Sequence, residues 1–520
     1  MEEKGGEGMS EKKSFIEVCF PIKEVSEESA REKNIRHGHI STLHIWWARR
    51  PLASSRATAY ASLIPVPESA SEIQRKKEFI IQLSKWENSL DERLIKQARE
   101  DILKANGGRL LKVLDPFAGG GSIPLECLRL GMETHAGEYN PVAVLILKCT
   151  LEFPQKYGRL RKNRENEGLF KAEKEESSLI ADVKRWGEWV LKLAKEEIGK
   201  FYPPDEDGSI PIGYIWARTI PCQNPSCGAE IPLMRQFWLA KKENKKISLF
   251  PFVVNNRVEL AIVQHNGKKW QVIESLIPDF KTEVPYNFEP EKGTVARAIA
   301  VCSVCGSMVD DNRVRKLFQE RKAGQRMVAV VLHNPKRQGK FYRLATERDL
   351  EVFKEAEKYL EEKRKKIYEE WGMDPVPDEE LPPKETLGFR VQRYGMLKWG
   401  DLFNSRQKLA LITFTEKVRL AYKKMIEEGY DKEYAKAVVS YLGLGVNRLA
   451  DRNSVLCRVI PQTEAIGFTY TRQALPMLWD YIEMNSLEHT SSWPSILDET
   501  IENLSHLTQI PPVEVENGEA

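Results

Sequence analysis

The chain has 520 residues, of which 41% are hydrophobic and 30% are charged. This composition is typical of a globular protein, and the length allows about two to four domains and at least one large core. The 79 basic and 76 acidic residues leave a net charge of only +3, so the overall charge favours no partner and a nucleic-acid surface would have to be a local patch.

The sequence carries no signal for export or membrane insertion. It has no run of about 18 apolar residues, and residues 1–14 are polar and charged, unlike a signal peptide. We therefore expect a cytoplasmic protein without a membrane partner, and a disordered tail over residues 1–14. Its eight cysteines are too few for a disulfide scaffold, and metal binding is the better interpretation in a reducing compartment.

Residues 37–57, HGHISTLHIWWARRPLASSRA, concentrate histidine, tryptophan and arginine. Such side chains can stack on bases and bind phosphates, or cover one side of a cofactor. Alternatively, the tryptophans line a core or groove and the arginines cap a helix. The candidates for contact with DNA or a cofactor are His44, Trp46, Trp47, Arg49 and Arg50.

Residues 66–109 are strongly charged and predict a helical cover, and residues 110–141 predict a strand, a glycine-rich turn, a helix and a second strand. The apolar run 110–114 is typical of a strand buried on both faces of a parallel sheet. The glycines at 119–121 permit positive φ and close approach of a ligand. The second strand, about 133–137, delivers Glu138 at the spacing of a carboxylate that binds ribose hydroxyls.

The glycines do not fit the GxGxxG pattern of dinucleotide sites, because Pro124 stands where the last glycine would be. Residues 115–122, DPFAGGGS, closely resemble the S-adenosylmethionine loop of amino-group DNA methyltransferases. The alternative is a tight turn without a ligand. The resemblance implies that residues 115–121 wrap the methionine part and that Glu138 binds the ribose. The cofactor-binding residues that it implies are Asp115, Pro116, Phe117, Ala118, Gly119, Gly120, Gly121, Ser122, Glu138, Asn140 and Glu519.

Four cysteines form two close pairs, CQNPSCG with Cys222 and Cys227, and CSVCG with Cys302 and Cys305. Each pair ends in glycine, as expected where backbone amides turn toward thiolate sulfurs. Four thiolates favour a closed, tetrahedral structural Zn²⁺ site, a zinc ribbon over about 215–312. An iron–sulfur cluster or four unrelated cysteines are the alternatives.

Residues 313–371 are charged and predict a long helical arm, and residues 433–456 predict a further helix. Residues 39–57 resemble the motif HxSTLHxWWARRPLAxxRA of the adenine-specific DNA methylases that contain a zinc ribbon, and the resemblance extends over nearly the whole chain. It implies an S-adenosylmethionine-dependent DNA adenine N6-methyltransferase, with DNA as partner. A closing strand-like segment would place Glu519 against the adenine ring of the cofactor.

The second signature of these enzymes, [DNS]PP[YFW], is absent from the sequence, so the catalytic residues are unknown. We therefore expect the N-terminal, cofactor-binding portion of a methylase, with a second polypeptide supplying the catalytic half. The alternatives are a truncated or fragmentary methylase, a DNA-binding or scaffold subunit without activity, and an RNA methyltransferase.

The expected fold is α/β, a Rossmann-like methyltransferase sheet with a large inserted zinc-ribbon and helical region. Residues 15–157 would hold the N-terminal motif and the first half of the methyltransferase domain. Residues 158–430 would form the insertion, and residues 431–520 would return to the methyltransferase domain.

Overall fold

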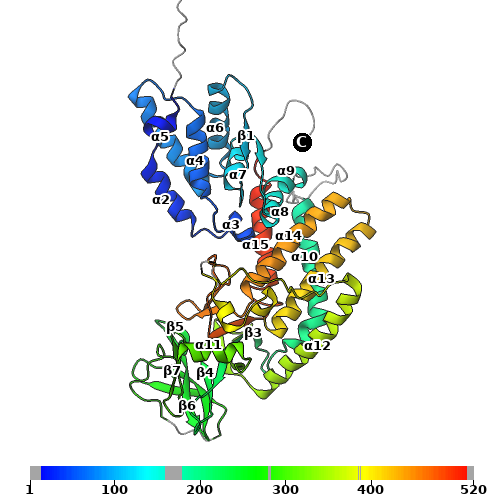
Figure 1. Cartoon of the computed structure of the whole chain (residues 1–520). Coiled ribbons are helices and arrows are strands. Elements are labelled where there is room, and N and C mark those ends of the chain that lie inside the picture. Colours follow the sequence, from blue (N-terminus) through cyan, green and yellow to red (C-terminus); the bar gives the residue numbers. More distant parts are fainter. Residues whose placement is uncertain (1–12, 159–177, 279–282, 385, 387, 512–520) are drawn as a thin grey trace, which may run out of the picture. The chain divides into compact units, whose positions relative to one another are not determined.

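The computed structural model describes residues 13–158, 178–278, 283–384, 386 and 388–511. The chain divides into two compact units (Figure 1). Unit 1 comprises residues 1–186, 425–444 and 498–520, and unit 2 comprises residues 187–424 and 445–497. The predicted tail, residues 1–14, lies almost entirely outside the described residues. Within the described part of the chain, no helix is both long and apolar enough to cross a membrane.

Unit 1 is mainly helical and begins with the elements drawn in blue to cyan in Figure 1. Its helices before the first strand are α1 (Phe15–Cys19), α2 (Ile22–Glu32), α3 (Ile40–Leu43), α4 (Leu52–Leu63), α5 (Ala70–Ser84), the 3₁₀ turn η1 (Trp86–Asn88) and α6 (Glu92–Ala105). After the second strand come α8 (Pro141–Leu147), the π-helical turn η2 (Lys148–Glu152) and α9 (Phe153–Tyr157). The helical cover predicted for residues 66–109 is thereby confirmed.

The glycine-rich segment forms the predicted strand–turn–helix–strand. Strand β1 (Lys112–Asp115) leads into helix α7 (Ser122–Arg129), and strand β2 (Glu133–Ala136) returns parallel to β1. Pro124 lies in the first turn of α7, where a missing N–H costs no hydrogen bond. Because the two strands are parallel, the residues that follow β1 and β2 emerge at the same edge of the sheet.

Strand β1 is not buried on both faces, and this part of the prediction is wrong. Leu114 is 69% exposed, and within the described residues β1 pairs with β2 alone. The apolar run therefore has helices over only part of its surface, whereas the prediction assumed neighbouring strands and cover on both sides.

Helix α4 is the centre of unit 1 and contacts helices α1, α2, α5, α6 and α7. Its inward face includes Ala57, Tyr60 and Ala61, all fully buried. On the side toward α7, Arg56 Nε lies 3.1 Å from Oε2 of Glu126, and Arg129 Nε lies 3.0 Å from the same oxygen. All three side chains are 0% exposed. Burial lowers the pKa of Arg56, so Glu126 is needed to compensate two buried guanidinium groups.

Unit 2 is built on an antiparallel sheet in the order β13-β12-β3-β16, to which β4 adds beside β3. A second antiparallel sheet has the order β5-β6-β7-β8, and two small ones have the orders β11-β10-β9 and β14-β15. The strands are β3 (Ile210–Pro221), β4 (Glu230–Leu233), β5 (Trp238–Lys242), β6 (Lys245–Val254), β7 (Arg257–His265), β8 (Trp270–Ser275), β9 (Val295–Ala296), β10 (Ile299–Val301), β11 (Met308–Val309), β12 (Gly324–His333), β13 (Lys340–Leu344), β14 (Arg458–Ile460), β15 (Ala465–Gly467) and β16 (Asp480–Met484).

Unit boundaries fall within four helices, α10, α13, α14 and α15. The remaining helices of the chain are α10 (Ser178–Ile198), η3 (Gly199–Phe201), α11 (Asp311–Gln319), α12 (Glu347–Trp371), η4 (Val391–Tyr394), η5 (Trp399–Leu402), α13 (Ser405–Glu427), α14 (Lys432–Arg452) and α15 (Trp493–Leu507). The predicted arm is helical in α11 and α12 but not between them. Strands β12 and β13 lie there, and β12 is buried in the main sheet through residues such as Val330.

The fold is therefore mixed α/β, with antiparallel larger sheets and one short parallel pair, β1 with β2. A complete Rossmann-like sheet is not present among the described residues. The fold class is thus confirmed at the coarse level of mixed helices and sheets.

The buried Arg56–Glu126–Arg129 group predicts a large effect of removing its carboxylate. Glu126→Ala leaves two buried guanidinium groups without their counter-charge and should lower the free energy of unfolding by about 3–5 kcal/mol. Urea titration followed by far-UV circular dichroism measures the loss. Glu100→Ala is the control, because Glu100 lies on α6 with a side chain 57% exposed and a long 3.9 Å contact to Lys96. Equal losses in the two variants would contradict the assigned role of Glu126.

Candidate functional site

The glycine turn between β1 and α7 has the backbone conformation that its sequence predicts. Gly119 and Gly121 have φ of +52° and +78°, in the left-handed region that disfavours other residues. The N–H of Gly121 donates to the carbonyl of Ala118 at 2.8 Å, and the N–H of Ala118 donates to the carbonyl of Gly137 at 2.9 Å. These bonds tie the turn after β1 to the residues after β2.

Glu138 fastens the same two segments through its carboxylate. Its Oε2 accepts a hydrogen bond from the N–H of Gly119 at 2.8 Å, and its Oε1 accepts from the N–H groups of Tyr139 at 2.8 Å and Asn140 at 3.2 Å. The backbone N–H groups of Asn140 and Gly119 hold the pKa of Glu138 below its ordinary value. The carboxylate is therefore ionised at neutral pH, and it has lone pairs left for a further donor such as a hydroxyl group.

The tryptophan–arginine motif packs directly on the glycine turn. A Cβ atom added to Gly119 would lie 2.5 Å from Nε1 of Trp46, and one added to Gly120 would lie 2.6 Å from Nε of Arg49. Real Cβ atoms do not approach other atoms so closely, so these two side chains fit only because the turn has no side chains there. Two motifs more than 60 residues apart thus form one surface.

The motif is held in place by a buried carboxylate of α2. Glu32 accepts hydrogen bonds from Nε2–H of His39 and from the N–H groups of Leu52 and Ala53, each at 2.8 Å. Burial alone would raise the pKa of Glu32, but His39 and the two N–H groups outweigh it and lower the pKa. His39 lies before Trp46 in the sequence, and Leu52 and Ala53 lie after it. The three donors therefore fix both ends of the stretch that contains Trp46 on α2 and α4.

The other predicted cofactor and DNA contacts differ in accessibility. Trp47, Arg50, Pro116 and Phe117 are exposed, Phe117 by 80%. His44 is half-buried, and its Nδ1 lies 2.8 Å from the carbonyl of Ile45.

Among the loop residues, Asp115 receives the N–H of Phe117 at 3.2 Å, and Asn140 caps α8 by accepting from the N–H of Val142. Ala118 and Ser122 are buried. Glu519 lies outside the described residues.

The four predicted metal ligands come together in unit 2. Cys222, Cys227, Cys302 and Cys305 have sulfur atoms within 4.8 Å of one another. The Sγ atoms of Cys222 and Cys305 are 3.6 Å apart, and those of Cys227 and Cys302 are 3.9 Å apart. Tetrahedral Zn²⁺ with bonds of about 2.3 Å places its sulfur ligands about 3.8 Å apart, so the cluster has the right size to hold such an ion.

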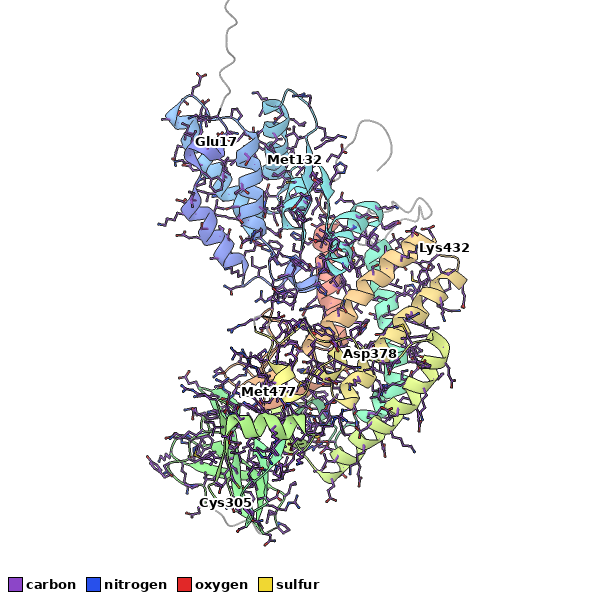
Figure 2. The ribbon with its side chains drawn as sticks, in the orientation of Figure 1. Glu17, Met132, Cys305, Asp378, Lys432 and Met477 are labelled. Atoms are coloured by element: carbon purple, nitrogen blue, oxygen red, sulfur yellow. The ribbon has the colours of Figure 1, made fainter. Side chains whose placement is uncertain are left out.

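Two hairpins carry the cysteines. Cys222 and Cys227 lie between β3 and β4, and Cys302 and Cys305 lie between β10 and β11. The glycine after each pair, Gly228 or Gly306, has a positive φ, as predicted for a turn that directs backbone amides toward sulfur. Figure 2 labels Cys305 beside the strands drawn in green.

From the sequence alone, Asn404, Arg406 and Gln407 in the stretch WGDLFNSRQ could contact DNA, be exposed to solvent or cap a helix, and the structure shows that all three are buried. Asn404 and Gln407 cap the start of α13 reciprocally, each side chain accepting the other's N–H at 2.9 Å. The Nδ2 of Asn404 also donates to Glu483 at 2.9 Å, and Arg406 forms an ion pair with the same carboxylate at 2.5 Å. Helix capping is therefore the correct interpretation for Asn404 and Gln407, whereas Arg406 belongs to a buried ion pair.

Sequence reasoning missed Arg56, Glu126 and Glu32 as residues that shape the site. Arg56 lies in the motif, five residues after Pro51. In the first turns of α4 its side chain is on the side of the helix that faces α7. No local signal identifies Glu126 as its partner, because the pairing depends on how two helices pack.

The contact between Trp46 and Gly119 predicts a non-additive pair of substitutions. Gly119→Ala should lower the unfolding free energy by about 1–3 kcal/mol beyond the cost of its left-handed backbone, because a Cβ collides with the indole. Gly107→Ala measures that backbone cost alone, since Gly107 has φ of +67° and no atom within 4 Å of an added Cβ. Combining Gly119→Ala with Trp46→Ala should recover the extra loss in a double-mutant cycle. Strictly additive losses would rule out the contact.

The cysteine cluster predicts bound metal. The purified chain should contain about one zinc ion, since structural sites of this type bind tightly, and Cys302→Ser should abolish it. Elemental analysis by mass spectrometry makes the measurement. Cys19→Ser is the control, because Cys19 lies in α1 of unit 1, outside the cluster. A folded wild-type chain without metal, or with iron in place of zinc, would contradict the zinc assignment.

Comparisons with known proteins found a match only for part of the N-terminal region. Residues 19–88 match the model of a family described as a protein of unknown function, DUF1156. The matched range contains the tryptophan–arginine motif and stops before the glycine turn. No curated protein matches the chain, and no solved structure does.

Proposed function

We propose that the chain binds S-adenosylmethionine at the glycine turn of unit 1 and acts as the cofactor-binding portion of a DNA adenine N6-methyltransferase. The observation that carries the proposal is the contact of Trp46 and Arg49 with Gly119 and Gly120. The same methylase resemblance includes both motifs, and a close fit between them is what a shared cofactor site requires.

The geometry around the turn supports a nucleoside ligand with a zwitterionic tail. The turn follows the carboxyl ends of two parallel strands, where ligands bind in open α/β sheets. Glu138 is ionised and still able to accept hydroxyl hydrogen bonds. The guanidinium of Arg49 lies over Gly120 and is suited to a carboxylate. Strands β1 and β2 would then begin a Rossmann-like sheet, the finer form of the fold class.

Binding orients the donor for transfer to an amine. S-adenosylmethionine supplies an electrophilic methyl group, and alignment with a nitrogen lone pair contributes much of the rate in such reactions. The residues of this chain would hold and shield the donor. An extrahelical adenine would be received by an amine-binding motif of the form [DNS]PP[YFW] on a second polypeptide, the proposed partner.

The cysteine cluster of unit 2 has a separate role in this proposal. Four thiolates form a closed site without an open position for chemistry. A Zn²⁺ ion there would be structural and would fasten the two cysteine hairpins to each other.

Titration calorimetry tests cofactor binding. Wild-type protein should bind S-adenosylmethionine, and Asp115→Ala should weaken binding at least about tenfold, equivalent to about 1.4 kcal/mol, because the side chain that anchors the turn at Phe117 is lost. Asp378→Ala serves as the control, since Asp378 is in unit 2 with a side chain 83% exposed.

Absence of binding by the folded wild-type protein would overturn the proposal. Transfer of a labelled methyl group, assayed with the second polypeptide on DNA and on RNA, then decides the acceptor. Transfer only to RNA would refute the DNA assignment, and cofactor binding without transfer to either would favour a scaffold role.

A further inference from the structure

Three segments of unit 2 that are distant in the sequence lie side by side on the cysteine hairpins. They are helix α11, the turn η4 and residues 472–479, which precede β16. The ring of Trp479 is perpendicular to that of Tyr394, with centroids 5.3 Å apart, and Phe318 of α11 contacts both rings at 6.2 Å and 5.7 Å. All three rings belong to the apolar cluster of the cysteine hairpins or pack against it. The segments therefore form one platform.

The start of η4 and the residues before β16 are in direct backbone contact. The N–H of Arg390 donates to the carbonyl of Leu475 at 3.0 Å. A Cβ atom added to Gly388 would lie 2.6 Å from Cβ of Ala474. The two segments therefore touch without a side chain of Gly388 between them.

The turn η4 directs two arginines to the surface. Val391 and Tyr394 are buried, and a 3₁₀ helix has three residues per turn, so residues three positions apart lie on the same side. Arg390 and Arg393 are also three positions apart and share a different side of η4. Both are exposed.

Two further exposed arginines lie beside this pair. The Nε2 of Gln319 in α11 donates to the carbonyl of Arg393 at 2.9 Å, and Arg321 follows Gln319 by two residues. Arg472 precedes Ala474 by two residues, and both Arg321 and Arg472 are exposed. We refer to Arg321, Arg390, Arg393 and Arg472 as the arginine strip.

The arginine strip carries positive charge without paired carboxylates. In the described ranges of the chain, none of its four side chains forms an ion pair. The nearby Glu320 is paired with Lys322 at 3.0 Å and Lys316 at 3.8 Å. Like charges that are brought together in this way repel one another and create a positive potential that attracts polyanions. Because the net charge of the chain is only +3, the strip is a local basic surface.

We propose that the arginine strip binds the phosphate backbone of duplex DNA. A duplex carries one negative charge per about 1.7 Å of its axis, and one 3₁₀ turn separates Arg390 from Arg393 by about 6 Å, so the two guanidinium groups can contact different phosphates. Such contacts position a duplex without reading its sequence. The choice of DNA as the polyanion rests on the proposed function, whereas the strip itself does not involve the cofactor site.

Fluorescence anisotropy of a short labelled DNA duplex, titrated with the full chain without cofactor at several salt concentrations, tests the proposal. Arg390→Gln combined with Arg393→Gln should weaken binding at least about tenfold at about 0.1 M salt. The slope of the logarithm of affinity against that of salt should become shallower by about 1.8, because each phosphate contact contributes about 0.9. Arg390→Lys combined with Arg393→Lys keeps both charges and should keep most of the slope.

The matched control is Lys365→Gln combined with Lys366→Gln, which removes two exposed charges from α12 and should leave both quantities near the wild-type values. Three results would overturn the inference: wild-type affinity and slope in the glutamine variant of the strip, an equal loss in the control variant, or tighter binding of the wild-type chain to an RNA duplex than to DNA. Calorimetry with S-adenosylmethionine is independent of these measurements. Failure of the proposed cofactor site is therefore distinguishable from failure of the arginine strip.

Discussion

The absence of side chains at Gly119 and Gly120 is the constraint on which the candidate cofactor site depends. An indole and a guanidinium occupy the space that two Cβ atoms would fill, so the turn and the motif cannot be varied independently. Their alignment depends in turn on buried charges. Glu32 holds the motif to α2 and α4, and Glu126 joins α4 to α7 through Arg56. The candidate site thus depends on two carboxylates that are themselves buried.

The cysteine hairpins of unit 2 illustrate a different way to fix a small structure. Strands β9, β10 and β11 are only two or three residues long, too short to be stable alone. Cys222 and Cys302 are part of an apolar cluster with Ile231, Val309 and Leu317. The sulfur atoms of these two cysteines therefore belong both to a hydrophobic core and to a cluster whose sulfur–sulfur distances fit a bound metal ion.

Local chemistry made much of this structure predictable from sequence. The glycine turn, the helix after it, the parallel return of β2 and the convergence of the two cysteine pairs each depend on residues close in the chain or on a known ligand geometry. The predictions failed where the burial of a residue depends on packing against residues that are distant in the sequence. Leu114 is apolar but exposed, because its strand has one partner in the described residues.

Strand β12 was not predicted, because the charged residues on both sides of it have a helical pattern and the predicted helix was extended across the strand. Asn404 is polar but buried, because Glu483, far away in sequence, receives its hydrogen bond. The predicted roles of the turn, of the motif and of the exposed Trp47 and Arg50 stay predictions, because they concern ligands and not the fold.

The division of unit 1 among three separate stretches of chain has a consequence for how the protein is made. Residues 13–158 emerge from the ribosome early, but Leu507 and Ile510 complete their core with Leu125 and Ile40. Contacts of such long sequence separation slow folding, because the loop must close before they form. Unit 2 lies largely within that loop and can fold during synthesis, whereas the core of unit 1 stays incomplete until Leu507 and Ile510 have been made. A chaperone that shields its exposed apolar surface during translation would therefore act mainly on unit 1.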